Sequence, residues 1–151
     1  MKKTMSVLFV SLCALAAIPP LSAVSYADTP ACQGFQVNKE LNPSCFFNQG
    51  CAINMQCAPG LLYWEVADFN TAAGNHTPKV TGRRPNGTTF SCTACSRNKE
   101  GFIVGCTGSV PLSVVDTDSQ FTVGTVNVPT AGGVFVFCEM SAGTWYESVS
   151  F

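Results

Sequence analysis

Residues 101–151 read GFIVGCTGSVPLSVVDTDSQFTVGTVNVPTAGGVFVFCEMSAGTWYESVSF, and this stretch decides the fold class. Segments rich in β-branched and aromatic residues alternate in it with short turns that contain Gly or Asp. Val134–Cys138 is apolar on both faces, which is typical of an interior strand. The pattern predicts strands at Phe102–Cys106, Val110–Val115, Phe121–Val128, Val134–Met140 and Trp145–Phe151.

The turns in this stretch carry their own signals. Thr107-Gly108 predicts a two-residue hairpin, and Ser141-Ala142-Gly143 predicts a three-residue hairpin with Gly143 at positive φ. The apolar phase of Phe121–Val128 changes faces at Gly124, which predicts a β-bulge. Glu147 interrupts the last strand, and we expect it to guard an edge against further pairing.

Upstream, period-two alternation predicts a strand at Ala52–Cys57. Aromatic and β-type residues predict further strands at Leu61–Phe69 and Thr88–Cys95. Residues 70–87 hold three Gly, two Pro and three Asn, and are expected to form a long loop. No segment after Ala27 sustains a 3.6-residue apolar period. The sequence therefore predicts an all-β fold, a small disulfide-stabilised antiparallel β-sandwich or barrel-like domain.

The N-terminal segment has the three parts of a secretory signal. Lys2 and Lys3 precede an apolar run over Val7–Ile18, and Ser25-Tyr26-Ala27 is a small-x-small cleavage site. The apolar run is shorter than the roughly 20 residues of a membrane span. We expect residues 1–27 to be a signal peptide and residues 28–151 to be one domain, secreted or periplasmic and without a membrane span.

Eight cysteines follow the predicted signal, an even number that indicates disulfides in an oxidising compartment. We expect disulfides to form within each half of the domain. The cysteines of the first half are Cys32, Cys45, Cys51 and Cys57, and those of the second half are Cys92, Cys95, Cys106 and Cys138. Within each set the pairing is open.

Two other uses of cysteine are disfavoured. Cys92-Thr93-Ala94-Cys95 has redox-motif spacing, but β-type residues surround it and no helix start is present to lower a thiol pKa. A zinc site built from Cys51, Cys57, Cys92 and Cys95 would need a wider spacing of Cys51 and Cys57 than zinc motifs use. We expect no metal and no cofactor.

Charge argues against nucleic acid as a partner. After Ala27 the chain has six Lys or Arg and nine Asp or Glu, a formal net charge of 6 − 9 = −3. Nucleic-acid-binding domains carry a pronounced basic excess instead.

Catalytic signals are weak. His76 is the one histidine, lies in the predicted loop and has no neighbouring Asp, and no Gly-x-Ser-x-Gly motif is present. The carboxylate pairs Glu65/Asp68 and Asp116/Asp118 are candidates for acid–base chemistry, although solvated strand-end and turn acids explain them more simply. Asp116-Thr117-Asp118-Ser119 offers too few ligands for a calcium loop. We therefore expect a protein that is not an enzyme.

Binding signals centre on two adjacent aromatic pairs. Because adjacent strand residues face opposite ways, each pair should place one ring in the core and one outside. Exposed Tyr or Trp beside polar residues is typical of sugar and protein recognition. Candidate binding residues are Tyr63, Trp64, Trp145, Tyr146, His76, Arg83 and Arg84.

The spacing Phe90-Ser91-Cys92, Cys95 and Cys106, followed by Gly132–Cys138, resembles one half of cyanovirin-type lectin domains. The resemblance covers about a third of the chain, and the first half has no matching repeat, so it implies no residue roles.

Three functions remain open: an exported non-catalytic module that binds glycan or another surface ligand, a secreted inhibitor or host-directed effector that binds a protein through the 70–87 loop, and an enzyme that works through carboxylates.

Overall fold

The computed structural model describes residues 28–36, 45–49, 51–57, 62–68 and 71–151. The predicted signal peptide lies outside the described residues. Fourteen strands and one short 3-10 helix, η1 (Ala31–Gln33), are present in the described part of the chain. The fold-class prediction is confirmed, since the protein is a nearly all-β, antiparallel, disulfide-stabilised sandwich.

Two six-stranded sheets form the layers. Sheet A has the order β11 (Ser119–Thr122), β7 (Lys79–Arg83), β14 (Trp145–Ser150), β4 (Ala52–Met55) and β3 (Phe46–Gln49), with β1 (Thr29–Pro30) also beside β14. Sheet B has the order β10 (Val110–Pro111), β8 (Phe90–Arg97), β13 (Gly133–Met140), β5 (Leu62–Asp68) and β2 (Phe35–Gln36), with β9 (Ile103–Cys106) also beside β8. A separate ribbon pairs β12 (Val126–Val128) with β6 (Gly74–His76).

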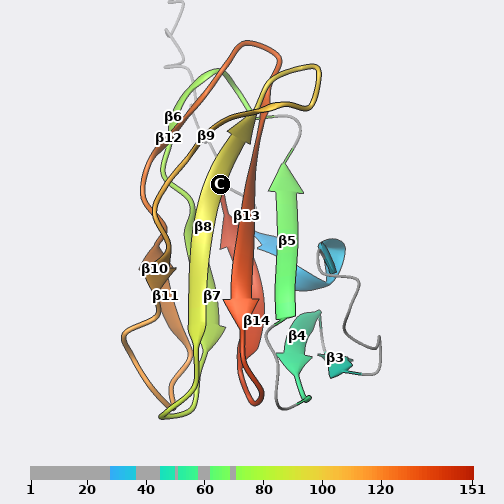
Figure 1. Cartoon of the computed structure of the whole chain (residues 1–151), viewed down its shortest axis with the longest axis vertical. Helices are drawn as coiled ribbons and strands as arrows, with labels where there is room; N and C mark the ends of the chain where they lie inside the picture. Colours follow the sequence, from blue (N-terminus) through green and yellow to red (C-terminus); the bar gives the residue numbers. More distant parts are fainter. Residues whose placement is uncertain (1–27, 37–44, 50, 58–61, 69–70) are drawn as a thin grey trace, which may run out of the picture.

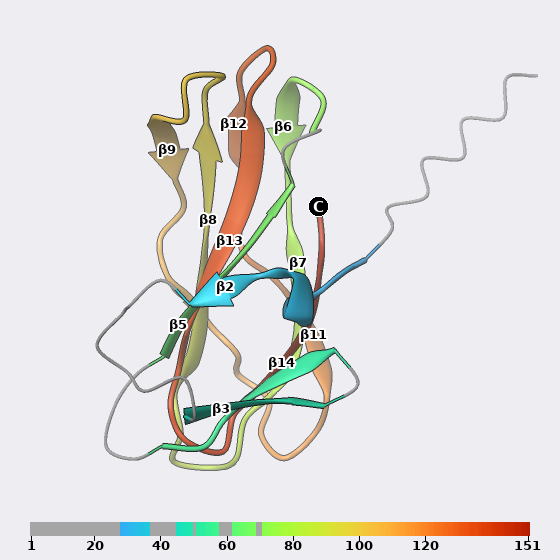
Figure 2. The same cartoon turned by 90° about the vertical axis from the view of Figure 1, so that its right-hand side faces the viewer.

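The layers are clear in two views. Figure 1 looks onto β8, β13 and β5 of sheet B, with β7 and β14 of sheet A behind them. Figure 2 shows sheet B on one side, sheet A on the other, and the β6–β12 ribbon near the upper end of the sandwich. Within that end, β12 lies against β8, β9 and β13.

The core forms where the inner faces of the two sheets meet. Val134, Val136, Cys138 and Met140 alternate along β13 and are buried in it, as predicted for an interior strand. From sheet A, Tyr146 and Val149 enter the same cluster. Burial of such side chains contributes roughly 1.5–3 kcal/mol each.

Four disulfides confirm that pairing stays within each half. In the first half Cys32 pairs with Cys51 and Cys45 with Cys57. In the second half Cys92 pairs with Cys138 and Cys95 with Cys106, and each of these pairs joins directly opposed residues of neighbouring strands.

The predicted hairpin at Thr107-Gly108 is wrong. Both β9 and β10 pair with β8, so the chain continues along one edge of β8 through this segment instead of reversing. Between the pairs Cys106–Cys95 and Val110–Cys92 it gains one extra residue, which makes the segment a bulge. The strand predicted at Val110–Val115 is correspondingly short and ends at Pro111.

Gly124 marks a corner instead of a bulge within one strand. At φ +94° it separates β11, which pairs with β7 in sheet A, from β12, which pairs with β6. The predicted change of apolar phase is thus a change of sheet.

The Ser141–Gly143 turn also connects two sheets, because β13 belongs to sheet B and β14 to sheet A. The hairpin prediction is wrong, although Gly143 has the predicted positive φ of 86°.

Two further predictions are wrong. The 70–87 segment is not a loop throughout, because it contains β6 and the five-residue strand β7. Glu147 does not guard an edge, because β14 lies inside sheet A between β7 and β4. In the described part of the chain, no helix has the length and apolar character needed to cross a membrane.

Candidate functional site

The outer face of sheet A along β7 and β14 is the candidate site. Along β7, Val80 and Gly82 are buried, whereas Lys79, Thr81 and Arg83 alternate with them and are accessible. Cross-strand partners share a face of a sheet, so the register adds their neighbours on β11 and β14. We call this surface the β7–β14 face; its residues are Lys79, Thr81, Arg83, Gln120, Thr122, Trp145, Ser148 and Ser150.

One end of the β7–β14 face carries its aromatic residue. Trp145 is directly opposite Arg83, and its side chain is half-buried while Arg83 is exposed. Asn54 lies on the other side of Trp145 and is held by a 3.0 Å hydrogen bond from its Nδ2 to the Thr144 carbonyl. An accessible ring beside an exposed guanidinium is suited to a ligand that has both an apolar face and polar groups.

A bulge in β14 brings a carboxyl group to this end. The register between β14 and β7 shifts between Tyr146 and Ser148, which leaves Glu147 as the extra residue. Burial raises the pKa of Glu147, the negative charge of Asp118 and a side-chain hydrogen bond with it raise that pKa further, and Arg83 lowers it. Two carboxyl groups in hydrogen-bond contact are closer than the roughly 5–9.5 Å that separates the catalytic pair of glycosidases.

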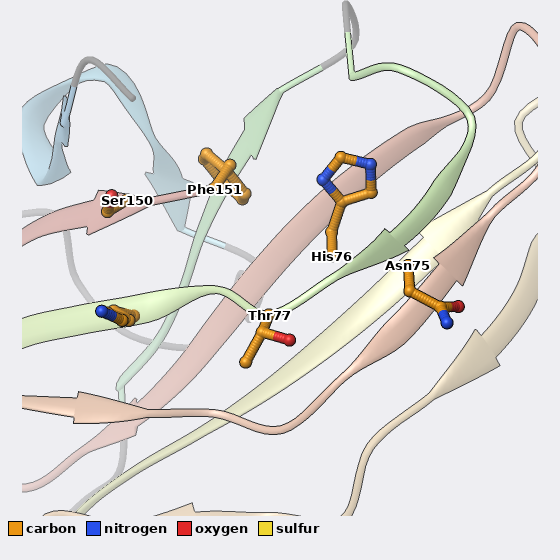
Figure 3. Close-up of a pocket in the computed structure, with 6 residues that line it drawn as sticks. Asn75, His76, Thr77, Ser150 and Phe151 are labelled. Carbon is orange, nitrogen blue, oxygen red and sulfur yellow. The ribbon is translucent and has the colours of Figure 1, made fainter. Parts of the chain in front are cut away.

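The other end of the β7–β14 face leads into a pocket of about 290 Å³. Asn75, His76, Thr77, Lys79, Ser150 and Phe151 line it. Figure 3 shows His76 pointing away from Asn75 and Thr77, toward the side on which Phe151 lies. The Nε2–H of His76 donates a 2.7 Å hydrogen bond to the Ala72 carbonyl, which fixes the ring. Lys79 supplies the one cationic side chain of this lining.

Polar pairs extend from this pocket across the β6–β12 ribbon. Asn127 Nδ2 donates to Asn75 Oδ1 at 2.9 Å, and the hydroxyls of Thr77 and Thr125 are 2.8 Å apart. All four side chains are exposed. The ribbon therefore presents amide and hydroxyl groups that are already positioned by each other.

Tyr146 must be corrected as a binding candidate. It is fully buried and packs against the Phe90 ring, with the ring centroids 5.8 Å apart. The rule of one ring inside and one outside is confirmed for this pair, since Trp145 is accessible. Tyr146 consequently has no surface to offer a ligand.

Arg84 lies next to the face but has a structural role. Its Nη1 donates to the Thr88 carbonyl at 3.1 Å, its Nη2 to the Ser113 carbonyl at 3.2 Å, and its Nε to the Leu112 carbonyl. These bonds tie the segment after β7 to the segment after β10. Arg83 thus remains the cation of this pair that faces solvent.

For the first aromatic pair only the backbone is described. Tyr63 and Trp64 lie in β5, opposite Glu139 and Cys138 of β13. Their predicted binding role stays a prediction. The structure does not bring them to the β7–β14 face, because β5 belongs to sheet B.

The carboxylate Glu65 on sheet B is ion-paired. Arg97 Nη2 lies 3.0 Å from Glu65 Oε1 and 3.1 Å from Oε2, and its guanidinium carbon lies 3.9 Å from the centroid of the Phe135 ring. Burial raises the pKa of Glu65 although the charge of Arg97 and the hydrogen bond to it lower that pKa. Arg97 thus holds the Glu65 carboxylate in place through both of its oxygens.

Sequence reasoning missed several members of the β7–β14 face, among them Lys79, Thr81, Gln120 and Ser148. The signal was present in Lys-Val-Thr-Gly-Arg at 79–83, which alternates polar and non-polar residues as a half-buried strand does. Gly82 and the nearby prolines are typical of loops, so the segment was predicted to be a loop instead of a strand.

No protein-family model matches the chain, and no curated protein matches it. Solved structures resemble parts of it. The enzymatically active domain of bacteriophage CBA120 tailspike protein 4 has a TM-score of 0.49 and 11% identity over 64% of this chain. An Arthrobacter globiformis T6 isomalto-dextranase in complex with panose has a TM-score of 0.45 and 16% identity over 65% of the chain. A Podospora anserina GH26-CBM35 beta-(1,4)-mannanase has a TM-score of 0.44 and 8% identity over 82% of the chain.

The chain spans 14%, 18% and 24% of the lengths of these three proteins, respectively. At TM-scores below 0.5 the likenesses carry no argument about this chain.

Proposed function

We propose that this protein is an exported, non-catalytic binding module that recognises glycans through the β7–β14 face. The observation that carries the proposal is the pairing of an accessible Trp145 with an exposed Arg83 on a face whose other side chains are polar. A sugar ring offers C–H groups that pack on an indole and hydroxyls that bond to guanidinium, amide and hydroxyl groups.

The shape of the face supports a ligand that lies along it. Lys79 and Arg83 are the two ends of the five-residue strand β7, so their Cα atoms lie four residue steps, or roughly 13 Å, apart at about 3.3 Å per residue. Between them the face carries the hydroxyls of Thr81 and Ser148 and the amide of Gln120. An extended polar ligand can therefore contact Trp145 at one end and the pocket of His76 at the other.

Export is supported by the four disulfides, which persist in oxidising compartments and are rare in the cytosol. Together with the signal predicted for residues 1–27, they favour a secreted or periplasmic protein.

The absence of catalysis is part of the proposal. The hydrogen-bond contact between Asp118 and Glu147 brings these carboxyl groups closer together than the acid–base pair of a glycosidase, which is separated by roughly 5–9.5 Å. The hydrogen bond from His76 Nε2 to the Ala72 carbonyl occupies one of the two ring nitrogens and holds the ring against the backbone. Within the described residues, no three His, Cys, Asp or Glu side chains gather to form a metal site.

A glycan array tests the proposal. The wild-type protein should bind a restricted set of glycans, Trp145→Ala should weaken binding at least tenfold, and Trp145→Phe should keep part of it because a ring remains. Phe102→Ala is the matched control, since Phe102 is a 71% exposed aromatic residue next to β9 of sheet B. Failure to bind any glycan, or equal binding by Trp145→Ala, would remove the proposal.

Protein recognition is the second candidate, and a different surface favours it. Phe102, Ile103 and Val104 are 71%, 60% and 57% exposed, which is unusual for three consecutive apolar residues. The 70–87 segment contains β6 and β7 and is therefore not the long loop through which protein binding was expected. Capture of a specific protein that is lost in Phe102→Ala and kept in Trp145→Ala would favour this function over the first.

A further inference from the structure

A second pocket, of about 210 Å³, opens between β9 and β12. Four of its lining residues belong to sheet B or its edge and three to the segment that forms β12. Figure 2 places β9 and β12 on neighbouring parts of the upper end of the sandwich, apart from β14. This β9–β12 groove does not share a lining residue with the pocket of His76.

An unpartnered hydroxyl lies in the wall of the β9–β12 groove. Ser96 is fully buried, and its Oγ has no hydrogen-bond partner among the described residues. A buried polar group without a partner costs about 1–3 kcal/mol. In a native protein such a group calls for a specific explanation, and Ser96 is among the residues that line this open pocket.

The lining defines the chemistry of that molecule. No Lys, Arg, Asp, Glu or His side chain lines the groove, so a neutral ligand fits it best. Asn127 uses one amide hydrogen to reach Asn75, and its amide oxygen has no bond within the described part of the chain. Val104 and Val126 add aliphatic walls.

From these features we propose that the β9–β12 groove holds a single neutral sugar residue, as a second glycan subsite separate from the β7–β14 face. A sugar ring combines hydroxyls for Ser96 and Asn127 with C–H faces for the two valines. The inference rests on the proposed glycan-binding function but uses none of the residues of the β7–β14 face.

Gly105 gives the means to test it. Gly105 is the direct cross-strand partner of Ser96, so a side chain at this position would project on the same side of the sheet as the Ser96 hydroxyl. A Cβ built there meets no atom within 4 Å, and Gly105 lines the groove. Gly105→Val therefore fills the groove without a clash. Gly108→Val is its matched control, because that Cβ also meets nothing within 4 Å and Gly108 does not line the groove.

The test is an NMR titration of the full chain with the methyl glycosides of glucose, galactose, mannose and N-acetylglucosamine. We expect the amide signals of Ser96, Gly105 and Asn127 to shift saturably with at least one glycoside. Gly108→Val should behave like the wild type, and Gly105→Val should bind at least tenfold more weakly.

The outcomes separate the two proposals. Loss of array binding in Trp145→Ala together with retained shifts at Ser96 supports both sites. Shifts at Ser96 with no effect of Trp145→Ala on the array support the groove and remove the β7–β14 face. Absence of any glycoside-induced shift at these amides, or unchanged binding by Gly105→Val, overturns the groove.

Discussion

Cys92 of β8 and Cys138 of β13 face each other directly across adjacent strands and are joined by a disulfide. The central strands of sheet B are thus linked covalently as well as by the hydrogen bonds of the sheet. The same relationship recurs at the edge of the sheet, where Cys95 of β8 is bonded to its cross-strand partner Cys106 of β9.

The two disulfides should differ in their contribution to stability. They close loops with sequence separations of 46 and 11 residues, and loop-closure entropy predicts about 4 and about 3 kcal/mol. We expect Cys92→Ala/Cys138→Ala to lower the free energy of unfolding more than Cys95→Ala/Cys106→Ala, because it also leaves cavities in the core. Urea unfolding of both double variants measures this, and the opposite order would contradict the account.

Tyr146 gives a second prediction, since its buried hydroxyl has no partner among the described residues. Removing that hydroxyl in Tyr146→Phe should raise the free energy of unfolding by about 1–2 kcal/mol. Thermal and urea unfolding at pH 7 measure the change. A clear loss of stability would mean that the hydroxyl is satisfied, for instance by a buried water.

The same substitution should change the response to alkaline pH. Burial raises the pKa of Tyr146 well above its ordinary value of 10.0, whereas the unfolded chain ionises near that value. The folded state therefore loses stability as the pH rises above about 10, and Tyr146→Phe should lose less. Parallel unfolding profiles of the two proteins from pH 9 to 11 would argue against this.

Glu147 should destabilise the protein at neutral pH. Its pKa is raised from 4.5 in the folded state, so stability falls as the pH rises from about 4.5 through that higher pKa. Glu147→Gln should therefore be more stable than the wild type at pH 7, with a gain that disappears below about pH 4. Burial is the larger cause of the raised pKa and the charge of Asp118 the smaller, so Asp118→Asn should give only part of this gain, and the two effects should not add in a double variant. Additive effects, or a gain that persists at pH 3, would show that the carboxyl contact is not the cause.

Arg97 should matter far more than its neighbour Lys99. Arg97→Ala leaves Glu65, which is 4% exposed, without its ion pair and uncovers Phe135, and should cost about 2–4 kcal/mol. Lys99→Ala breaks an exposed 3.6 Å contact with Glu100 and should cost about 0.5 kcal/mol or less. Equal losses in urea unfolding would remove the structural role given to the Arg97 cluster.

The sequence predicted the features that depend on residues close together in the chain, namely the fold class and the burial of single strands. The all-β class follows from alternation and from the absence of a helical period, and Val134–Cys138 was identifiable as an interior strand because both of its faces are apolar. The pair Trp145 and Tyr146 was predicted to place one ring in the core and one at the surface. Which of the two rings lies outside depends on the face that sheet A turns outward, and the sequence did not predict that face.

Sheet membership could not be predicted, because it depends on distant partners. The Ser141–Gly143 turn has hairpin chemistry, yet Met55 binds it from sheet A: its N–H donates to the Thr144 carbonyl and its carbonyl accepts from Gly143 N–H. Gly82 is a second example, because it contributed to the incorrect prediction of a loop over residues 70–87. It is a strand residue whose missing side chain makes room for the Phe90 ring, since a Cβ there would lie 2.1 Å from Phe90 Cε1. Met55 is far from the Ser141–Gly143 turn in sequence, and Phe90 belongs to a different sheet from Gly82.

The central claim is that glycans contact Trp145, and fluorescence tests this most directly. The chain has two tryptophans, so Trp64→Phe leaves Trp145 as the single indole reporter. An oligosaccharide selected on the array should change its emission saturably, with the same dissociation constant that calorimetry gives. Binding detected by calorimetry while the emission of Trp145 stays unchanged would contradict the account.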